Sequence, residues 1–189
     1  MDLYHVGFYE IKDIDLKHGR KNADFGQGFY LSNNLEFSKN WASMRTDLDT
    51  ILNCYELNMT DLNVLEFTYN SEYWFDYIFK NRNGYDDIYK EYDVIIGPIA
   101  NDTIFDLYGV ITSGLIDNKM ALKILKEGPK YYQIVIKTEK AKANLKFINS
   151  IILDKNEIIN NRNIKLEEER KYQELMLSVV NKKVKNILS

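Results

Sequence analysis

The chain has 189 residues, of which 45% are hydrophobic and 28% charged, a balance typical of one soluble globular domain with room for a helical appendage. Its formal net charge of −3 provides no general attraction to nucleic acid or to an anionic membrane. Cys54 is the single cysteine and there are two histidines, which excludes an internal disulfide and disfavours a metal site. We expect a cytoplasmic protein without a membrane span, because neither a run of about 18 apolar residues nor a secretory signal pattern is present.

The first half of the chain predicts short strands separated by polar turns. Apolar or alternating runs indicate strands over residues 3–6, 28–31, 51–57 and 63–69. Asn33 or Asn34 is expected to cap a helix over 35–44, and Ser71 to cap another over 72–81.

The second half mixes strands and helices without strict alternation. A short strand over 93–96 is expected to end at Gly97-Pro98, and helices follow over 104–113 and 118–127. The run YYQIVIK predicts a last strand over 131–137. This order indicates an α+β fold.

The tail differs from the rest of the chain, and we predict a domain over 1–148 followed by a helical extension over 149–189. Residues 165–188 form a strongly helical stretch with acidic residues near its start and lysines near its end, as the helix dipole favours. Apolar side chains recur there at helical spacing: Tyr172, Met176, Val179, Val180, Val184 and Ile187. This narrow stripe allows three interpretations: the helix docks on the domain, self-associates, or binds a partner.

The most informative segment is DFGQGFYLSNNLEFSKNWA at 24–42. Glycines flank Gln27 just before an aromatic strand, and glycine lets a flat ligand approach the backbone closely. We expect Tyr30 on the strand and Trp41 at the end of the next helix to face each other across a slot suited to a planar heterocycle. The alternative is a buried hairpin whose aromatic side chains belong to the core.

Four segments occur in a characteristic order: LYH at 3–5, DFGQGFYLS at 24–32, YDVIIGPIANDT at 92–103 and QIVIKTEKA at 133–141. Together they resemble the bacterial DUF3990 family, of the ADP-ribosyltransferase superfamily (PARP-like His–Tyr–Glu/Gln type), over residues 3–148. The resemblance implies ADP-ribosyltransferase-like split β-sheets that grip NAD as a co-substrate. It also implies cleavage of the nicotinamide–ribose bond and transfer of ADP-ribose to a protein or nucleic acid. Such proteins often act as bacterial toxins, and the tail helix would then bind an antitoxin.

The resemblance also assigns roles. His5 would hydrogen-bond the ribose of NAD, and Tyr30, in Gly28-Phe29-Tyr30, would support the nicotinamide ring. Ser38 would offer its hydroxyl to the nicotinamide amide, and Trp41 would cover the other face of the ring.

This chain departs from the superfamily pattern at two positions. The usual His-Gly-Ser/Thr becomes His5-Val6-Gly7, so the backbone N–H and C=O of Val6 would have to recognise the amide. Gln133 stands where the superfamily carries its catalytic Glu. A glutamine can hold a ribose hydroxyl but supplies only a dipole to the developing positive charge, a deficit of about 3 kcal/mol or about a hundredfold in rate.

Two carboxylates are alternative carriers of the chemistry. Glu139 lies six residues beyond Gln133, about 20 Å along a straight strand, and is expected to begin a helix capped by Thr138. Asp102, in the GPIAND loop, either acts in the site or caps the next helix.

Asn101 and Arg20 complete the candidate set. Asn101 is a candidate for the NAD phosphate or ribose, and the guanidinium of Arg20 suits pyrophosphate oxygens. Three other functions stay open: an NAD glycohydrolase, a catalytically impaired NAD or ADP-ribose binding module, and an interaction protein that uses the 165–188 helix.

Overall fold

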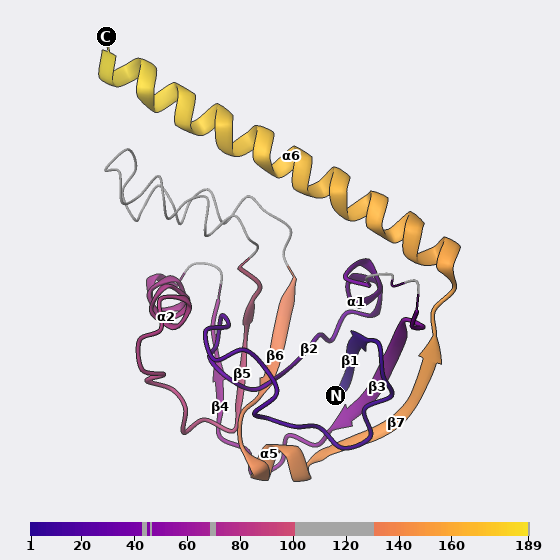
Figure 1. The fold of residues 1–189 in the computed structure, drawn as a ribbon. Coiled ribbons are helices and arrows are strands. Elements are labelled where there is room, and N and C mark those ends of the chain that lie inside the picture. Colours follow the sequence, from indigo (N-terminus) through magenta and orange to yellow (C-terminus); the bar gives the residue numbers. More distant parts are fainter. Residues whose placement is uncertain (43–44, 46, 69–70, 101–130, 189) are drawn as a thin grey trace.

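The computed structural model describes residues 1–42, 45, 47–68, 71–100 and 131–188; in the last helix the side chains at 172, 175–176, 179–180 and 182–188 are also left undescribed. Within these residues the chain forms two small β-sheets and four helices, so the expected α+β class is confirmed (Figure 1). The predicted helices over 104–113 and 118–127 lie outside the described residues.

The first sheet has three antiparallel strands in the order β1-β3-β7. They are β1 (Asp2–Gly7), β3 (Ile51–Leu57) and β7 (Leu145–Ile152). The sequence did not predict β7, because a register shift beside Cys54 and Tyr55 interrupts its alternation and three of its isoleucines are exposed. This strand runs through residue 148, where we expected the domain to end.

The second sheet has four strands in the order β2-β6-β5-β4, with only the β4–β5 pair parallel. They are β2 (Phe29–Leu31), β4 (Val64–Glu66), β5 (Val94–Pro98) and β6 (Tyr132–Ile136). The predicted end of β5 before Gly97-Pro98 was wrong. Both residues pair with β6, Gly97 opposite Gln133, and the proline is tolerated because it is the last residue of the strand.

The first two helices begin where their caps predict. Asn34 accepts a hydrogen bond from the third helical residue of α1 (Leu35–Asn40), and Ser71 does the same for α2 (Glu72–Arg82). The structure ends α1 before the predicted residue 44 and leaves Trp41 as its C-cap. Helix α2 extends one residue beyond its predicted end, to Arg82.

The last two described helices follow the final strands of the sheets. Thr138 caps α5 (Glu139–Ala143), as expected. Helix α6 (Lys155–Leu188) begins ten residues before the predicted start at 165 and crosses one side of the molecule in Figure 1. Among the described residues, no helix combines the length and apolarity required to cross a bilayer.

Two apolar clusters form most of the core. One lies between the second sheet and α2 and contains Phe25, Phe67, Trp74, Phe75, Tyr77, Ile78, Ile95, Ala100 and Val135. The other joins the two sheets and contains Leu3, Ile14, Phe29, Leu31, Tyr55, Leu57, Val94, Ile134, Ile136 and Ala141. Each large side chain buried in this way contributes about 1.5–3 kcal/mol. The two clusters fix the strands on which the site is built.

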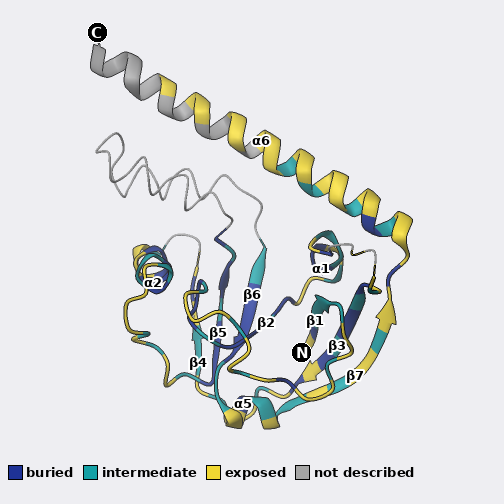
Figure 2. Cartoon of the chain, viewed as in Figure 1, coloured by how far each residue is buried: buried dark blue, intermediate teal, exposed yellow. Residues whose placement is uncertain are grey.

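Helix α6 is attached mainly through its first turns. Ile158 is buried with Leu52 and Leu153 in a small third cluster, and Glu157 forms an ion pair with Lys39 of α1 at 2.8 Å. Beyond this point most described side chains of α6 are exposed (Figure 2). The apolar stripe predicted over 172–187 falls on side chains outside the description.

Candidate functional site

A cavity of about 760 Å³ lies where the two sheets meet. This volume falls within the range of small-molecule sites. Its lining includes eight of the residues singled out in the sequence: His5, Val6, Arg20, Gly28, Tyr30, Ser38, Trp41 and Gln133. The structure therefore brings together residues that are up to 128 positions apart in the chain, His5 and Gln133 being the extremes.

His5 presents an acceptor nitrogen for a ligand. Its Nδ1 lies 2.9 Å from the Tyr30 carbonyl, and because a carbonyl only accepts, Nδ1 carries the proton. Burial lowers the pKa of His5 from its usual 6.5, against the opposing effect of this hydrogen bond. The neutral ring therefore has Nε2 as an acceptor, suited to a hydroxyl donor.

The backbone of Val6 faces the same edge of β1 as that of Tyr4. Tyr4 exchanges two hydrogen bonds with Ser32, and in an antiparallel ladder the backbone groups of residues two apart point to the same side. The N–H and C=O of Val6 therefore point away from β3, toward the cavity edge. The Val6 side chain packs against the third cluster, so its branching leaves these groups accessible.

The ring of Tyr30 lines the cavity, while its hydroxyl forms hydrogen bonds with the loop that precedes β2. The hydroxyl donates to the Gly26 carbonyl at 2.7 Å and accepts from the Phe25 N–H at 2.9 Å. Burial and the Asp24 carboxylate raise the pKa of this phenol. Tyr30 can therefore offer a ring face, but it is poorly suited to donate a proton to substrate.

Packing within the protein explains the glycines of the 24–31 segment. A Cβ on Gly28 would lie 2.6 Å from the Ile136 carbonyl oxygen and 2.7 Å from a Val135 methyl group. Gly26 has φ +75°, a left-handed conformation that favours glycine. Packing and backbone conformation therefore account for both glycines: close approach of β6 requires Gly28, and a tight turn requires Gly26.

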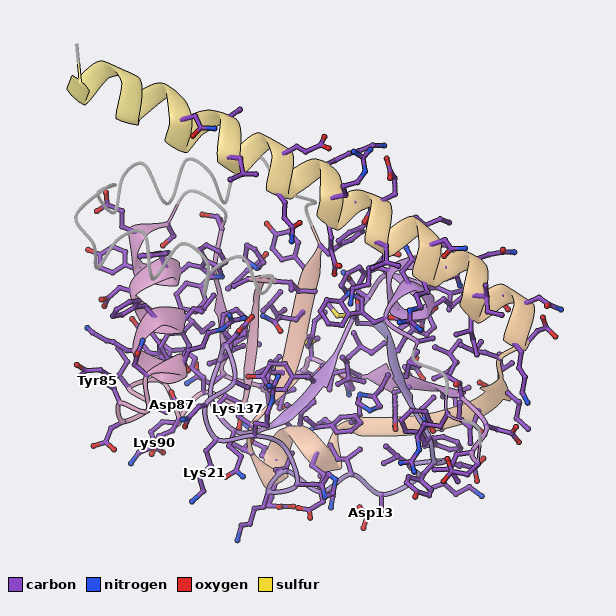
Figure 3. All side chains as sticks on the ribbon, turned by 45° about the horizontal axis from the view of Figure 1, so that its top comes forward. Asp13, Lys21, Tyr85, Asp87, Lys90 and Lys137 are labelled. Atoms are coloured by element: carbon purple, nitrogen blue, oxygen red, sulfur yellow. The ribbon has the colours of Figure 1, made fainter. Side chains whose placement is uncertain are left out.

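A partly buried ion pair holds the turn at Gly26. Asp87 contacts Lys137 and accepts from the Tyr77 hydroxyl at 2.6 Å, and Asp87 and Lys137 lie side by side (Figure 3). Lys137 also donates to the Phe25 carbonyl. Burial lowers the pKa of Lys137, against the opposing effect of Asp87. The loop is therefore tied to β6 from outside the cavity.

Ser38 and Trp41 form the α1 side of the cavity. Ser38 is buried, and its hydroxyl donates to the Asn34 carbonyl at 2.9 Å. Trp41 is 44% exposed, and the Lys165 ammonium of α6 lies 3.9 Å from the centroid of its ring. A planar ligand that stacks on this face of Trp41 has to displace Lys165.

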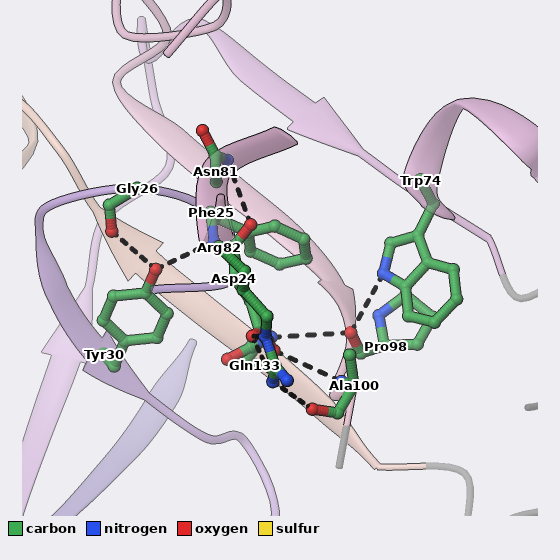
Figure 4. A network of polar contacts seen from close by, with 10 residues as sticks. All are labelled: Asp24, Phe25, Gly26, Tyr30, Trp74, Asn81, Arg82, Pro98, Ala100 and Gln133. Carbon is green, nitrogen blue, oxygen red and sulfur yellow. Dashed lines mark hydrogen bonds and ion pairs between the residues drawn. The ribbon is translucent and has the colours of Figure 1, made fainter. Parts of the chain in front are cut away.

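A polar network forms the cavity floor around Gln133 (Figure 4). Gln133 Nε2 donates to Asp24 Oδ2 at 2.8 Å, and Asp24 Oδ1 lies 2.6 Å from Arg82 Nη2 and 2.7 Å from Arg82 Nε. Asp24 and Gln133 are each only 8% exposed. A carboxylate therefore stands directly behind the glutamine, already paired with a guanidinium.

The other predicted residues have separate outcomes. Arg20 lies at an exposed position in the cavity lining, compatible with its expected contact to phosphate oxygens. Glu139 begins α5 behind Thr138 and does not line the cavity. Asn101 and Asp102 lie outside the described residues.

Sequence reasoning missed Asp24 and Arg82. Asp24 belongs to the DFGQGFY string, and an acidic residue directly before a buried aromatic and glycine turn was the available signal. Arg82 fell beyond the predicted end of its helix, so nothing in the local pattern directed it to the cavity.

The structure thus defines an α+β domain whose two sheets meet at a small-molecule-sized cavity. Residues 1–147 match the model of the family described as a protein of unknown function, DUF3990. The chain belongs to the DUF3990 family. No curated protein matches the chain.

Proposed function

We propose that this protein binds NAD in the cavity, cleaves its nicotinamide–ribose bond and transfers ADP-ribose to a macromolecular acceptor. The resemblance of the four sequence segments to ADP-ribosyltransferases motivates the reaction. The toxin role and an antitoxin or a second copy bound through the 165–188 helix are further parts of this hypothesis.

One observation carries the proposal: the residues to which the resemblance assigns NAD contacts line the same cavity. His5, Tyr30, Trp41 and Gln133 come from β1, β2, the end of α1 and β6. The resemblance lies in four short sequence segments, whereas the cavity lining is a property of the folded chain.

The side-chain chemistry fits a nucleoside with a planar base. His5 Nε2 can accept from a ribose hydroxyl, and the backbone of Val6 offers a donor and an acceptor to a carboxamide. The ring of Tyr30 and the exposed indole of Trp41 are surfaces for stacking, which contributes about 1–3 kcal/mol for each base.

Nicotinamide release from NAD tests the reaction. Purified protein should bind NAD in calorimetry and release nicotinamide, faster when cell extract supplies acceptors. Trp41→Ala should weaken NAD binding about tenfold, through lost stacking. Tyr85→Ala is the matched control, because Tyr85 is also an exposed aromatic but lies outside the cavity lining.

A second candidate function is an NAD or ADP-ribose binding module without turnover. It is favoured by the uncharged amide of Gln133 and by the pairing of Asp24 with Arg82, which together leave the cavity floor with little net negative charge. Binding of NAD without nicotinamide release, even with extract present, would select this function. Release in the absence of any acceptor would instead identify a glycohydrolase.

A further inference from the structure

The contact between Asp24 and Gln133 fixes which end of the glutamine amide is available to a ligand. A carboxylate can only accept hydrogen bonds, so the amide nitrogen of Gln133 has to face Asp24 Oδ2. The same nitrogen lies 3.5 Å from the Pro98 carbonyl. The amide oxygen, Oε1, is therefore the group that Gln133 can offer as an acceptor.

Both acceptors that hold this amide are themselves held by α2. Arg82 pairs with the Asp24 carboxylate, and Asn81 Nδ2 donates to the Asp24 carbonyl at 3.0 Å. The indole of Trp74 donates to the Pro98 carbonyl at 3.1 Å. The Ala100 N–H also donates to Asp24 Oδ2, at 3.2 Å. The orientation of the Gln133 amide is thus set by a rigid frame.

We propose that Asp24 is a positioning residue that orients Gln133 so that its Oε1 accepts a hydrogen bond from a ribose hydroxyl of the ligand. This inference rests on the proposed function for the identity of the ligand. The positioning contact itself is a property of the free protein.

The same contact explains why residue 133 carries an amide. A glutamate at this position would place two carboxylates within hydrogen-bond distance, and such a pair resists having both groups ionised. Arg82 already compensates the single charge of Asp24. A neutral side chain with a donor on one end and an acceptor on the other suits this neighbour.

The first test is the side-chain amide signal of Gln133 in labelled wild-type protein, assigned by triple-resonance NMR. Nitrogen-bound protons held by a buried carboxylate should exchange with water at least tenfold more slowly than those of exposed glutamines such as Gln173. Exchange at the rate of an exposed glutamine would overturn the proposal without any variant having to fold.

The second test removes the carboxylate. Asp24→Asn should accelerate exchange of the Gln133 amide at least tenfold and weaken ADP-ribose binding at least fivefold. Asp87→Asn is the matched control, because Asp87 is also ion-paired and holds the same loop but does not contact Gln133. It should leave the Gln133 amide signal unchanged. Equal effects of the two variants would show that loop stability, and not positioning, is responsible.

The third test transposes the two groups. Gln133→Glu alone should raise the unfolding equilibrium constant at least tenfold, measured in urea. Combining it with Asp24→Asn restores one amide and one carboxylate in contact and should recover most of that loss. Strictly additive effects of the two substitutions would mean that the side chains do not interact.

These outcomes separate this inference from the proposed function. If the Gln133 amide depends on Asp24 but neither NAD nor ADP-ribose binds, the ligand assignment and the proposed function fail while the contact stands. If NAD binds and turns over but the amide is unprotected or insensitive to Asp24→Asn, positioning by Asp24 is wrong and the proposed function stands.

Discussion

The cavity floor and helix α6 both carry arginine–carboxylate pairs, but the two regions are built in opposite ways. At the floor, Asp24 and Arg82 are each about 10% exposed and share further hydrogen bonds with β6 and the chain after β5. On α6, Arg170 pairs with Glu167 and Glu174, and all three side chains are about half exposed. We therefore expect an arginine–carboxylate pair to contribute more to folding stability at the cavity floor than on α6.

This difference follows from solvation. A buried charge that loses its partner stays uncompensated in a poor solvent, whereas an exposed charge is rehydrated. The Asp24–Arg82 pair is therefore a strong constraint at the cavity floor, whereas α6 is held by its first turns and by a few contacts at the cavity rim.

Arg82→Met should be the most destabilising change. It leaves the Asp24 carboxylate buried without its guanidinium, which costs about 3–5 kcal/mol. The free energy of unfolding in urea measures the loss. Arg170→Met is the matched control on α6, and it should leave that free energy unchanged within error. Similar losses in the two variants would contradict the contrast between the regions.

Gly26→Ala should cause the second largest loss of folding stability. The alanine would occupy a left-handed conformation, at a cost of about 1–2 kcal/mol. Its Cβ would also clash with Asp87 Oδ2, which Lys137 and Tyr77 hold in place, and overpacking of this kind adds about 1–3 kcal/mol. Gly84→Ala provides the comparison, with φ +76°; among the described residues other than its chain neighbours, the nearest atom to its Cβ would be Asn22 Nδ2 at 3.6 Å. Only the backbone cost should appear there. Equal destabilisation of the two variants would show that Asp87 can yield.

His5 should make the free energy of unfolding depend on pH. Because burial lowers the pKa of folded His5, the unfolded chain binds a proton first as the pH falls below about 6.5. The stability that neutral His5 contributes is therefore fully present above about pH 6.5, and it is lost as the pH falls toward the pKa of His5 in the folded protein. Unfolding measured between pH 5 and 8 should show this slope in the wild type and a smaller slope in His5→Asn. An identical slope in both would assign it to other groups.

Lys165→Ala should have the smallest effect. A cation over an indole face contributes about 0.5–1 kcal/mol at an exposed site, so removing it should leave folding nearly unchanged. NAD should bind two- to fivefold more tightly, because the ring no longer has to release Lys165. Lys171→Ala, six residues further along α6 at an exposed position, should leave the affinity unchanged. Unchanged affinity in Lys165→Ala would show that the ligand does not use this face of Trp41.

Local features of the fold were predictable from the sequence. The caps at Asn34, Ser71 and Thr138 act within three residues, and the core strands show their apolar runs directly. The α+β class followed from their order. Strand β7 was not predicted, because its bulge interrupts the alternation of buried and exposed residues and its outer face carries apolar side chains.

The cavity floor could not be predicted in the same way. Asp24 contacts Gln133 across 109 positions and Arg82 across 58, and no local pattern encodes such contacts. The glycines were recognised, but their cause lies in Val135, Ile136 and Asp87, which are remote in sequence. The sequence therefore identifies candidate site residues, but it does not show which other residues each of them contacts.

The position of β7 has a practical consequence for anyone who expresses this domain alone. The family match ends at residue 147, three residues into an eight-residue strand. A protein truncated at this residue would lose the β7 residues that pair with Ile51–Cys54. The backbone N–H and C=O groups on that side of β3 would then be unpaired, and such an exposed strand edge promotes aggregation. Such a fragment should aggregate, whereas one extended through Asp154 keeps the edge covered.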